Sequence, residues 1–217
     1  MKNLIIVGDS FCANEGWPDI LADKLDMHLL KNGAGGQSWW PNRKFLTKLT
    51  TEQWGNSDTI IFCHTNAERI LSSNEEAHWI DWSKASPSSE NELEKAIALH
   101  LKYFYNSEIL HWSVKKWYEE INQSWSRTRT IHLHCFSTSW ELRHLLTGLH
   151  VGPDLSSISL DEIDCPSMLY KDHRCNHLNK FNNKELAEQL CSLILNYDQG
   201  QAMLDTSKFQ LVANTNI

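Results

Sequence analysis

The sequence lacks the features that mark membrane, secreted and nucleic-acid-binding chains. No apolar run among its 217 residues reaches the ~18 that are needed to span a bilayer. Residues 1–7 lead directly into Gly8-Asp9-Ser10, without the charged and then apolar pattern of a signal peptide. No block of Lys and Arg occurs, and 20 basic against 27 acidic residues give a net charge of −7. We therefore expect a cytoplasmic protein that binds neither nucleic acid nor membrane.

Cysteine pairs of the CxxC type are also absent, which argues against a zinc ribbon. The six cysteines are an even number, so disulfides are an alternative. However, Cys12, Cys63 and Cys135 lie inside or beside apolar runs, where free thiols pack as small hydrophobic groups. We therefore expect a reduced chain. Hydrophobic residues make up 41% and charged residues 22% of the chain, a globular composition that excludes a mostly disordered protein.

Short apolar runs alternate with amphipathic helical patterns along the chain. The runs predict strands at residues 2–7, 27–30, 58–63 and 130–136. The helical patterns cover residues 17–25, 38–49, 90–125 with a break at 106–107, 139–146 and 183–195. This alternation predicts an α/β layer fold with a mainly parallel sheet. We expect one domain, 1–217, with a helical insert at about 72–128, irregular structure at 151–170, and a polar C-terminal tail at about 198–217, either loose or docked.

Polar and glycine residues follow three of the predicted strands at their carboxyl ends, where parallel sheets hold their active sites. Ser10 follows the first strand, Gly33 the second and Asn66 the third. A serine on a tight strand-to-helix turn can act as a nucleophile, and a backbone N–H at Gly33 and the Asn66 amide could hold an oxyanion. Each segment also has a plain structural interpretation, with Asp9, Ser10 and Asn66 as helix caps and Gly33 in an ordinary turn.

A polar segment before the last predicted helix offers a general base. Asp172 precedes His177 by five residues, and a carboxylate that orients an imidazole is the usual support of a serine nucleophile. A metal site is a weaker alternative, because a loop does not place its side chains on one face as a helix does. The residues of that alternative are His173, Cys175, His177, His132 and His134. A solvated polar loop is the plain interpretation of the segment.

Taken in order, four segments resemble the sequence blocks of the SGNH (GDSL-type) hydrolase superfamily. The matching segments are Gly8-Asp9-Ser10, residues 31–38, His64-Thr65-Asn66 and His177-Leu178-Asn179. The resemblance covers the framework at residues 2–62 and 130–195. It implies a three-layer α/β/α sandwich with a flavodoxin-like sheet, with Ser10 as nucleophile and His177 as base. It also implies an oxyanion hole made by the backbone N–H groups of Ser10 and Gly33 and by the Asn66 amide.

The acid of the catalytic set departs from the family pattern. The family usually carries it three residues before the base, where this chain has Arg174. Asp172 lies five residues before His177, so the loop must bulge for its carboxylate to reach the imidazole. A Ser-His dyad oriented by a backbone carbonyl is the alternative, and His173 could replace His177 as base.

A less specific resemblance links the chain to SGNH-like proteins of tailed bacteriophages, through residues 65–69, residues 103–106 and the Trp-rich insert. It implies a protein made in the host cytoplasm that acts on host or virion components. His64 stands where the family usually has glycine, and we predict that it contacts substrate together with Trp39, Trp40 and Arg69. For Arg69 a local ion pair is the alternative that we favour.

Ester hydrolysis through an acyl-enzyme is the function that these features predict, without a cofactor or a metal. The substrate is an acylated small molecule or glycan. An O-acetylated carbohydrate is a reasonable choice if the insert forms a cap beside the cleft and contributes to an aromatic wall. The tryptophans of that wall are Trp39, Trp40, Trp112, Trp117 and Trp125; the plain interpretation is that most are core residues. A catalytically weak or inactive binding protein in a phage-host or virion assembly is the alternative function.

Overall fold

The computed structural model describes residues 2–13, 15–55, 57–67, 69, 86–159 and 178–210. Six parallel strands form one sheet in the order β2-β1-β3-β4-β5-β6. The strands are β1 Asn3–Val7, β2 His28–Asn32, β3 Ser57–His64, β4 Arg129–His134, β5 Leu149–Gly152 and β6 Gly200–Met203. The strand order changes direction beside β1, with β2 on one side and β3 on the other. Ligand crevices of open parallel sheets lie at such a switch point.

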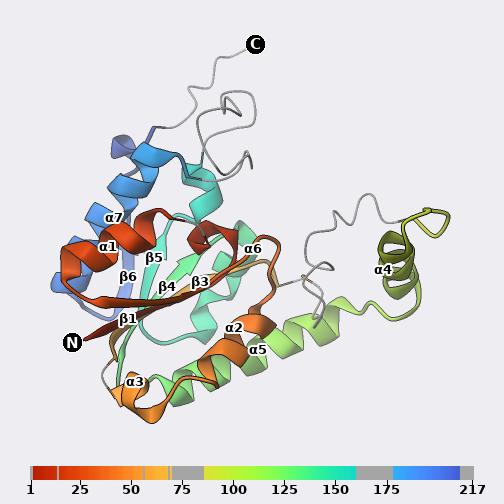
Figure 1. Cartoon of the computed structure of the whole chain (residues 1–217), viewed down its shortest axis with the longest axis horizontal. Coiled ribbons are helices and arrows are strands. Elements are labelled where there is room, and N and C mark those ends of the chain that lie inside the picture. The colour runs from red at the N-terminus through yellow and green to blue at the C-terminus, as the bar shows by residue number, and fades with distance from the viewer. Residues whose placement is uncertain are drawn as a thin grey trace.

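Helices cover both faces of the sheet, which confirms the predicted three-layer α/β/α fold (Figure 1). One face carries α1 (Trp17–Leu25) and α7 (Lys180–Leu195), and the other carries α2 (Trp39–Leu46) and α5 (Ser107–Ser124). The remaining α-helices in the described ranges are α3 Thr51–Gly55, α4 Glu92–Tyr103 and α6 Ser137–Glu141. None of the described helices is long and apolar enough to cross a membrane.

The alternation of side chains along β1 divides the core into two halves. Leu4 and Ile6 pack in the cluster beneath α1 and α7, whereas Ile5 and Val7 pack in the cluster beneath α2 and α5. Successive side chains of a strand point to opposite faces, and a parallel sheet covered on both faces needs apolar residues on both. This is why the run at residues 4–7 is continuously apolar.

Two strands were missed by the sequence interpretation. β5 lies at the start of the stretch predicted as irregular from residue 151, and β6 lies within the polar tail predicted from residue 198. Each has only four residues, and β6 is mostly exposed at the edge of the sheet. Segments this short and polar carry no hydrophobic period. Their pairing with each other and with β4 makes Gly200–Met203 a docked extension.

The helical insert contains α4 and α5, and α5 is part of the sandwich. Asn91 caps α4 and Asn106 caps α5 through their side-chain oxygens, so the predicted break at 106–107 is confirmed. Trp117 and Ile121 of α5 are buried in the core. Figure 1 shows α4 beyond the end of α5, away from the sheet. Among the described residues of the insert, α5 is therefore a core layer and not a cap, and α4 lies away from the sheet; residues 72–85 of the insert lie outside the described residues.

Candidate active site

Ser10 lies at the start of a short 3-10 helix, η1 (Ser10–Cys12), that directly follows β1. The cap of this helix is Asp9, whose Oδ1 accepts a hydrogen bond from the Phe11 N–H at 3.1 Å. The capping role therefore belongs to Asp9 and not to Ser10. Within the described residues the Ser10 hydroxyl has no hydrogen-bond partner, although the residue is only 7% exposed. A nucleophilic serine is expected at such a position, because its hydroxyl is left available to a base and a substrate.

Gly33 packs against the turn that carries Ser10. A Cβ atom at Gly33 would lie 2.7 Å from the Asp9 carbonyl oxygen and 2.9 Å from Cys12 Sγ, so only glycine allows this approach. The adjacent strands are held here by a hydrogen bond from the Gly8 N–H to the Asn32 carbonyl, 3.0 Å. The structure thus brings the first two predicted segments together, as an oxyanion hole requires.

Asn42 of α2 fixes the carboxyl ends of β1 and β2, and the sequence interpretation missed it. Its Nδ2 donates to the Gly8 carbonyl at 2.9 Å, and its Oδ1 accepts from Asn32 Nδ2 at 2.8 Å. The side chain is 5% exposed. The only signal in the sequence is an asparagine within a helix that otherwise turns apolar residues toward the sheet.

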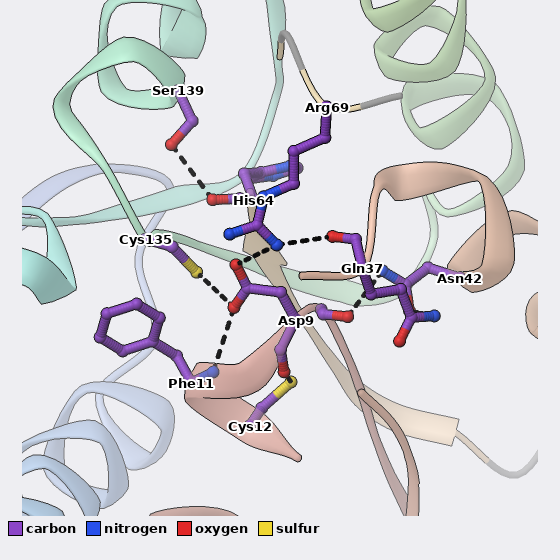
Figure 2. A network of polar contacts seen from close by, with 10 residues as sticks. Asp9, Phe11, Cys12, Gln37, Asn42, His64, Arg69, Cys135 and Ser139 are labelled. Atoms are coloured by element: carbon purple, nitrogen blue, oxygen red, sulfur yellow. Dashed lines mark hydrogen bonds and ion pairs between the residues drawn. The ribbon is translucent and has the colours of Figure 1, made fainter. Parts of the chain in front are cut away.

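Arg69 holds the nucleophile turn from the β3 side (Figure 2). Its Nη1 lies 3.4 Å from Oδ2 of Asp9, which is fully buried, and donates to the Gln37 carbonyl at 3.0 Å. The Asp9 contact is an ion pair without hydrogen-bond geometry, since Oδ2 has no hydrogen-bond partner. The guanidinium carbon lies 5.4 Å from the Phe136 ring centre. The ion pair gives Arg69 a structural role, although its partner Asp9 is distant in the sequence and not a local one; the contact of Arg69 to substrate stays a prediction.

Cys135 supports the other oxygen of Asp9. Its Sγ–H donates to Asp9 Oδ1 at 3.2 Å. Burial and the nearby Asp9 carboxylate raise the pKa of Cys135, so the thiol keeps the proton that it donates. Burial likewise raises the pKa of Cys63. The predicted reduced state is confirmed for the four described cysteines, Cys12, Cys63, Cys135 and Cys191; Cys165 and Cys175 lie outside the described residues.

Asn66 follows β3 at the same edge of the sheet and borders a small cavity of about 20 Å³. Thr65 and residues of α2 and α5 complete its wall. The Asn66 carbonyl accepts a hydrogen bond from the Arg69 N–H at 3.3 Å, which gives the segment a tight turn after the strand. All three strand ends that the sequence selected therefore meet at one edge, at Ser10, Gly33 and Asn66.

His64 lies in a buried row of four histidines, and not in an open cleft. The row consists of His64 on β3, His132 and His134 on β4, and His150 on β5, and it faces α5 because residues 62, 64, 132 and 134 share one face. The His64 ring also contacts the Tyr118 ring, with 4.8 Å between ring centres. His64 borders the small cavity and is 5% exposed, so its contact to substrate stays a prediction that only a ligand inside this cavity would fulfil.

The hydrogen bonds of this histidine row define its tautomers. His132 Nε2 lies 2.9 Å from the Thr147 carbonyl, which only accepts, so this nitrogen carries the proton. His132 Nδ1 then accepts from His64 Nε2 at 2.9 Å. In the same way His150 Nε2 donates to the Leu146 carbonyl and His150 Nδ1 accepts from His134 Nε2.

Burial keeps the histidine row neutral. It lowers the pKa of His132 to about 3 and that of His134 to about 2, and the neighbouring histidines add to the effect. The pKa values of His64 and His150 are also lowered, chiefly by burial. Among the described residues no group of three or more His, Cys, Asp or Glu could hold a metal ion. His173, Cys175 and His177 of the metal alternative lie outside the described residues.

The predicted aromatic wall forms only in part. Trp39 of α2 stacks on Trp117 of α5 with 5.7 Å between ring centres, and Trp40 meets Trp39 edge to face at 5.5 Å. Trp125 is 2% exposed and belongs to the core, where it stacks on Trp54. Trp112 is 60% exposed on α5 and makes no ring contact to the other four among the described residues. Trp39 and Trp117 therefore border the site, and the rest do not form a continuous wall with them.

The predicted base His177 and its partner Asp172 lie outside the described residues, but the chain next to them is fixed. Trp17 Nε1 donates to the Phe11 carbonyl at 2.8 Å, and the Trp17 N–H donates to Asn183 Oδ1 at 2.9 Å. Asn183 Nδ2 in turn donates to the Leu178 carbonyl at 2.8 Å. An unbroken set of hydrogen bonds therefore connects the residue after Ser10 with the residue after His177.

Asn182 joins the two sides of the undescribed segment. Its Nδ2 donates to the Ile158 carbonyl at 3.0 Å, and its backbone N–H donates to Asn179 Oδ1 at 2.8 Å. The side chain is fully buried. The chain therefore leaves at Ile158 and returns at Asn179 close to the same point. Asn182 had not been singled out in the sequence, since it resembles an ordinary polar residue of a first helical turn.

Comparison with known proteins yields similarity to solved structures only. No protein-family model matches the chain, and no curated protein sequence matches it. A solved structure of a protein of the G-D-S-L family from Desulfitobacterium hafniense DCB-2 is 14% identical, with a TM-score of 0.49 over 89% of this chain and 99% of that one. A carbohydrate esterase, described as having an active site with divergent catalytic and non-catalytic binding functions, is 12% identical with a TM-score of 0.44, over 91% of this chain and 65% of that one. Sequence identities and TM-scores this low support no conclusion about activity, so an activity must be argued from the residues of this chain.

Proposed function

We propose that this protein is a serine ester hydrolase of the SGNH type. The observation that carries the proposal is the meeting of three segments at one sheet edge: Ser10 on its capped turn, Gly33 packed against that turn, and Asn66 after β3. These segments were selected from the sequence because each matches a block of that superfamily. The fourth matching segment, His177-Leu178-Asn179, is supported by the hydrogen bond that fixes Leu178, the residue next to His177.

The reaction follows from the roles of these groups. His177 removes the proton of the Ser10 hydroxyl, and Ser10 Oγ bonds to the acyl carbon of the ester. The backbone N–H groups of Ser10 and Gly33 and the Asn66 amide hold the oxyanion, and each donor lowers the barrier by about 3 kcal/mol. The alcohol leaves with the proton from His177. Water, deprotonated by His177, then releases the acid and restores Ser10. Asp172 orients the imidazole.

The substrate in this proposal is an acylated small molecule or a glycan. Trp39 at the border of the site is partly exposed and offers an aromatic ring of the kind that binds sugar rings, whereas Trp117 is buried behind it. We extend the proposal to the biological setting through the resemblance of residues 65–69 and 103–106 to proteins of tailed bacteriophages: the protein is made in the host cytoplasm and acts on host or virion components.

The test is hydrolysis of p-nitrophenyl acetate by the wild type and by Ser10→Ala, with fluorophosphonate labelling followed by intact mass. We expect turnover and a single label in the wild type, and neither in Ser10→Ala. His177→Ala tests the base separately and should lower kcat by about 10³-fold or more. Unchanged turnover in Ser10→Ala would refute the mechanism. A folded wild type with neither turnover nor label would favour the alternative of a non-catalytic binding protein with the same fold.

A further inference from the structure

A small cavity lies between the end of β3, α2 and α5, beside the predicted oxyanion donor Asn66. Its volume is about 20 Å³, which suffices for one water-sized group and little more. Its apolar wall is formed by Trp39 of α2 and by Val114, Trp117 and Tyr118 of α5. The helical insert thus contributes to the site through α5, although it does not form the cap that the sequence suggested.

We propose that this cavity is the acyl pocket of the esterase and restricts it to acetyl esters. The inference rests on the proposed function. Asn66 belongs to the wall of the cavity, so an acyl group whose carbonyl oxygen is bound by the Asn66 amide is placed beside it. Ser10 Oγ bonds to the acetyl carbon, the bond from that carbon to the alcohol oxygen breaks, and water later releases acetate.

Two buried polar atoms in the wall of the cavity have no hydrogen-bond partner among the described residues. Trp39 Nε1 and Thr65 Oγ1 are both buried and make no hydrogen bond, and both residues belong to the wall. A buried donor without a partner is costly, so such atoms indicate a ligand that brings a hydrogen-bond acceptor. Every ester brings such an acceptor in its carbonyl oxygen, so these two atoms support an ester ligand of any acyl length, and the limit to acetyl rests on the volume and rigidity of the cavity.

The wall also resists widening. Trp117 is stacked on Trp39 at an interplanar angle of 14° and meets Phe62 edge to face at 6.2 Å. Tyr118 is 2% exposed and Val114 is 3% exposed. Close-packed interiors accept added methylene groups poorly. We expect kcat/KM to fall about tenfold or more for each methylene added beyond acetyl, within the range seen for pockets of this kind.

The experiment measures kcat/KM for p-nitrophenyl acetate, propionate and butyrate, with the rate of Ser10→Ala subtracted. Val114→Ala removes two methyl groups from the wall and should raise the butyrate-to-acetate ratio about tenfold. Ile121→Val is the matched control, because Ile121 lies on the same helix in the same core cluster but outside the cavity wall. It removes one methyl group from the core and should leave the ratio unchanged.

A preference for acetate that Val114→Ala relaxes, and that Ile121→Val keeps, supports the acetyl pocket. Ser10-dependent turnover with butyrate equal to or better than acetate in the wild type overturns the pocket and leaves the esterase proposal intact. Absence of Ser10-dependent turnover of every ester refutes both. If Val114→Ala does not fold, the order of the three esters with the wild type decides the question.

Discussion

Acidification should destabilise the fold through the histidine row. The folded protein keeps these imidazoles neutral, since burial lowers the pKa of His132 to about 3 and that of His134 to about 2. In the unfolded chain a histidine has a pKa of about 6.5. Between these values the unfolded chain binds protons that the folded protein does not. The stabilising contribution is therefore fully present above pH 6.5 and is lost as the pH falls toward the folded pKa.

The magnitude follows from linkage. Each histidine that stays neutral only in the folded state costs about 1.4 kcal/mol per pH unit below 6.5. Between pH 7 and pH 5 this amounts to about 2 kcal/mol each, or about 4 kcal/mol for His132 and His134 together. The lowered pKa values of His64 and His150 add to the loss in the same direction. Since a domain is stable by about 5–15 kcal/mol, the effect is a large part of the total.

The assay is urea unfolding at pH 7, 6 and 5, followed by tryptophan fluorescence. His134→Gln should reduce the pH slope of the unfolding free energy by about 1.4 kcal/mol per pH unit below 6.5, one histidine's share. His144→Gln is the matched control, because it makes the same substitution at an exposed ring outside the buried row. A stability that is constant or rises from pH 7 to pH 5 would refute the reasoning.

Three substitutions test the polar contacts around the nucleophile turn. Gly33→Ala places a Cβ 2.7 Å from the Asp9 carbonyl, and a displaced turn should lower kcat by about 10²-fold, as measured with p-nitrophenyl acetate. Asn42→Ala leaves the Gly8 carbonyl without its donor and should cost about 1–3 kcal/mol in urea unfolding. Arg69→Met leaves the buried Asp9 carboxylate without its cation and should cost about 3 kcal/mol. Arg69→Lys should restore part of that stability. An unchanged kcat in Gly33→Ala, or unfolding free energies equal to wild type in Asn42→Ala and Arg69→Met, would contradict these assignments.

The main strands and helices were predictable from the sequence because their hydrophobic residues follow clear patterns. The apolar runs that became β1, β3 and β4 are long enough to be buried on both sides, and the helix at 183–195 has a clear apolar face. The three strand-end segments were predictable for the same reason: once the strands are placed, parallel pairing brings their carboxyl ends to one edge. No knowledge of side-chain contacts is required for either step.

The partners of Asp9 could not be predicted in this way. Arg69 and Cys135 reach it from the ends of β3 and β4, and their contacts depend on the directions of side chains after the strands end. The position of His64 was missed for a related reason. The alternation of His132 and His134 in the sequence indicates one shared face, but only the packing of α5 over that face makes it buried.

The candidate site is held by two kinds of force that substitutions can separate. Polar contacts fix the nucleophile turn: Asn42 holds it to β2, and Arg69 holds it to the end of β3. Both groups are buried or nearly so, and changing either should therefore alter stability and turnover together. The cavity beside Asn66 depends instead on the packing of α5, so Val114→Ala should change which ester is preferred while the nucleophile turn keeps its contacts. A variant of Val114 that loses all turnover, with stability retained, would show that α5 also positions the turn.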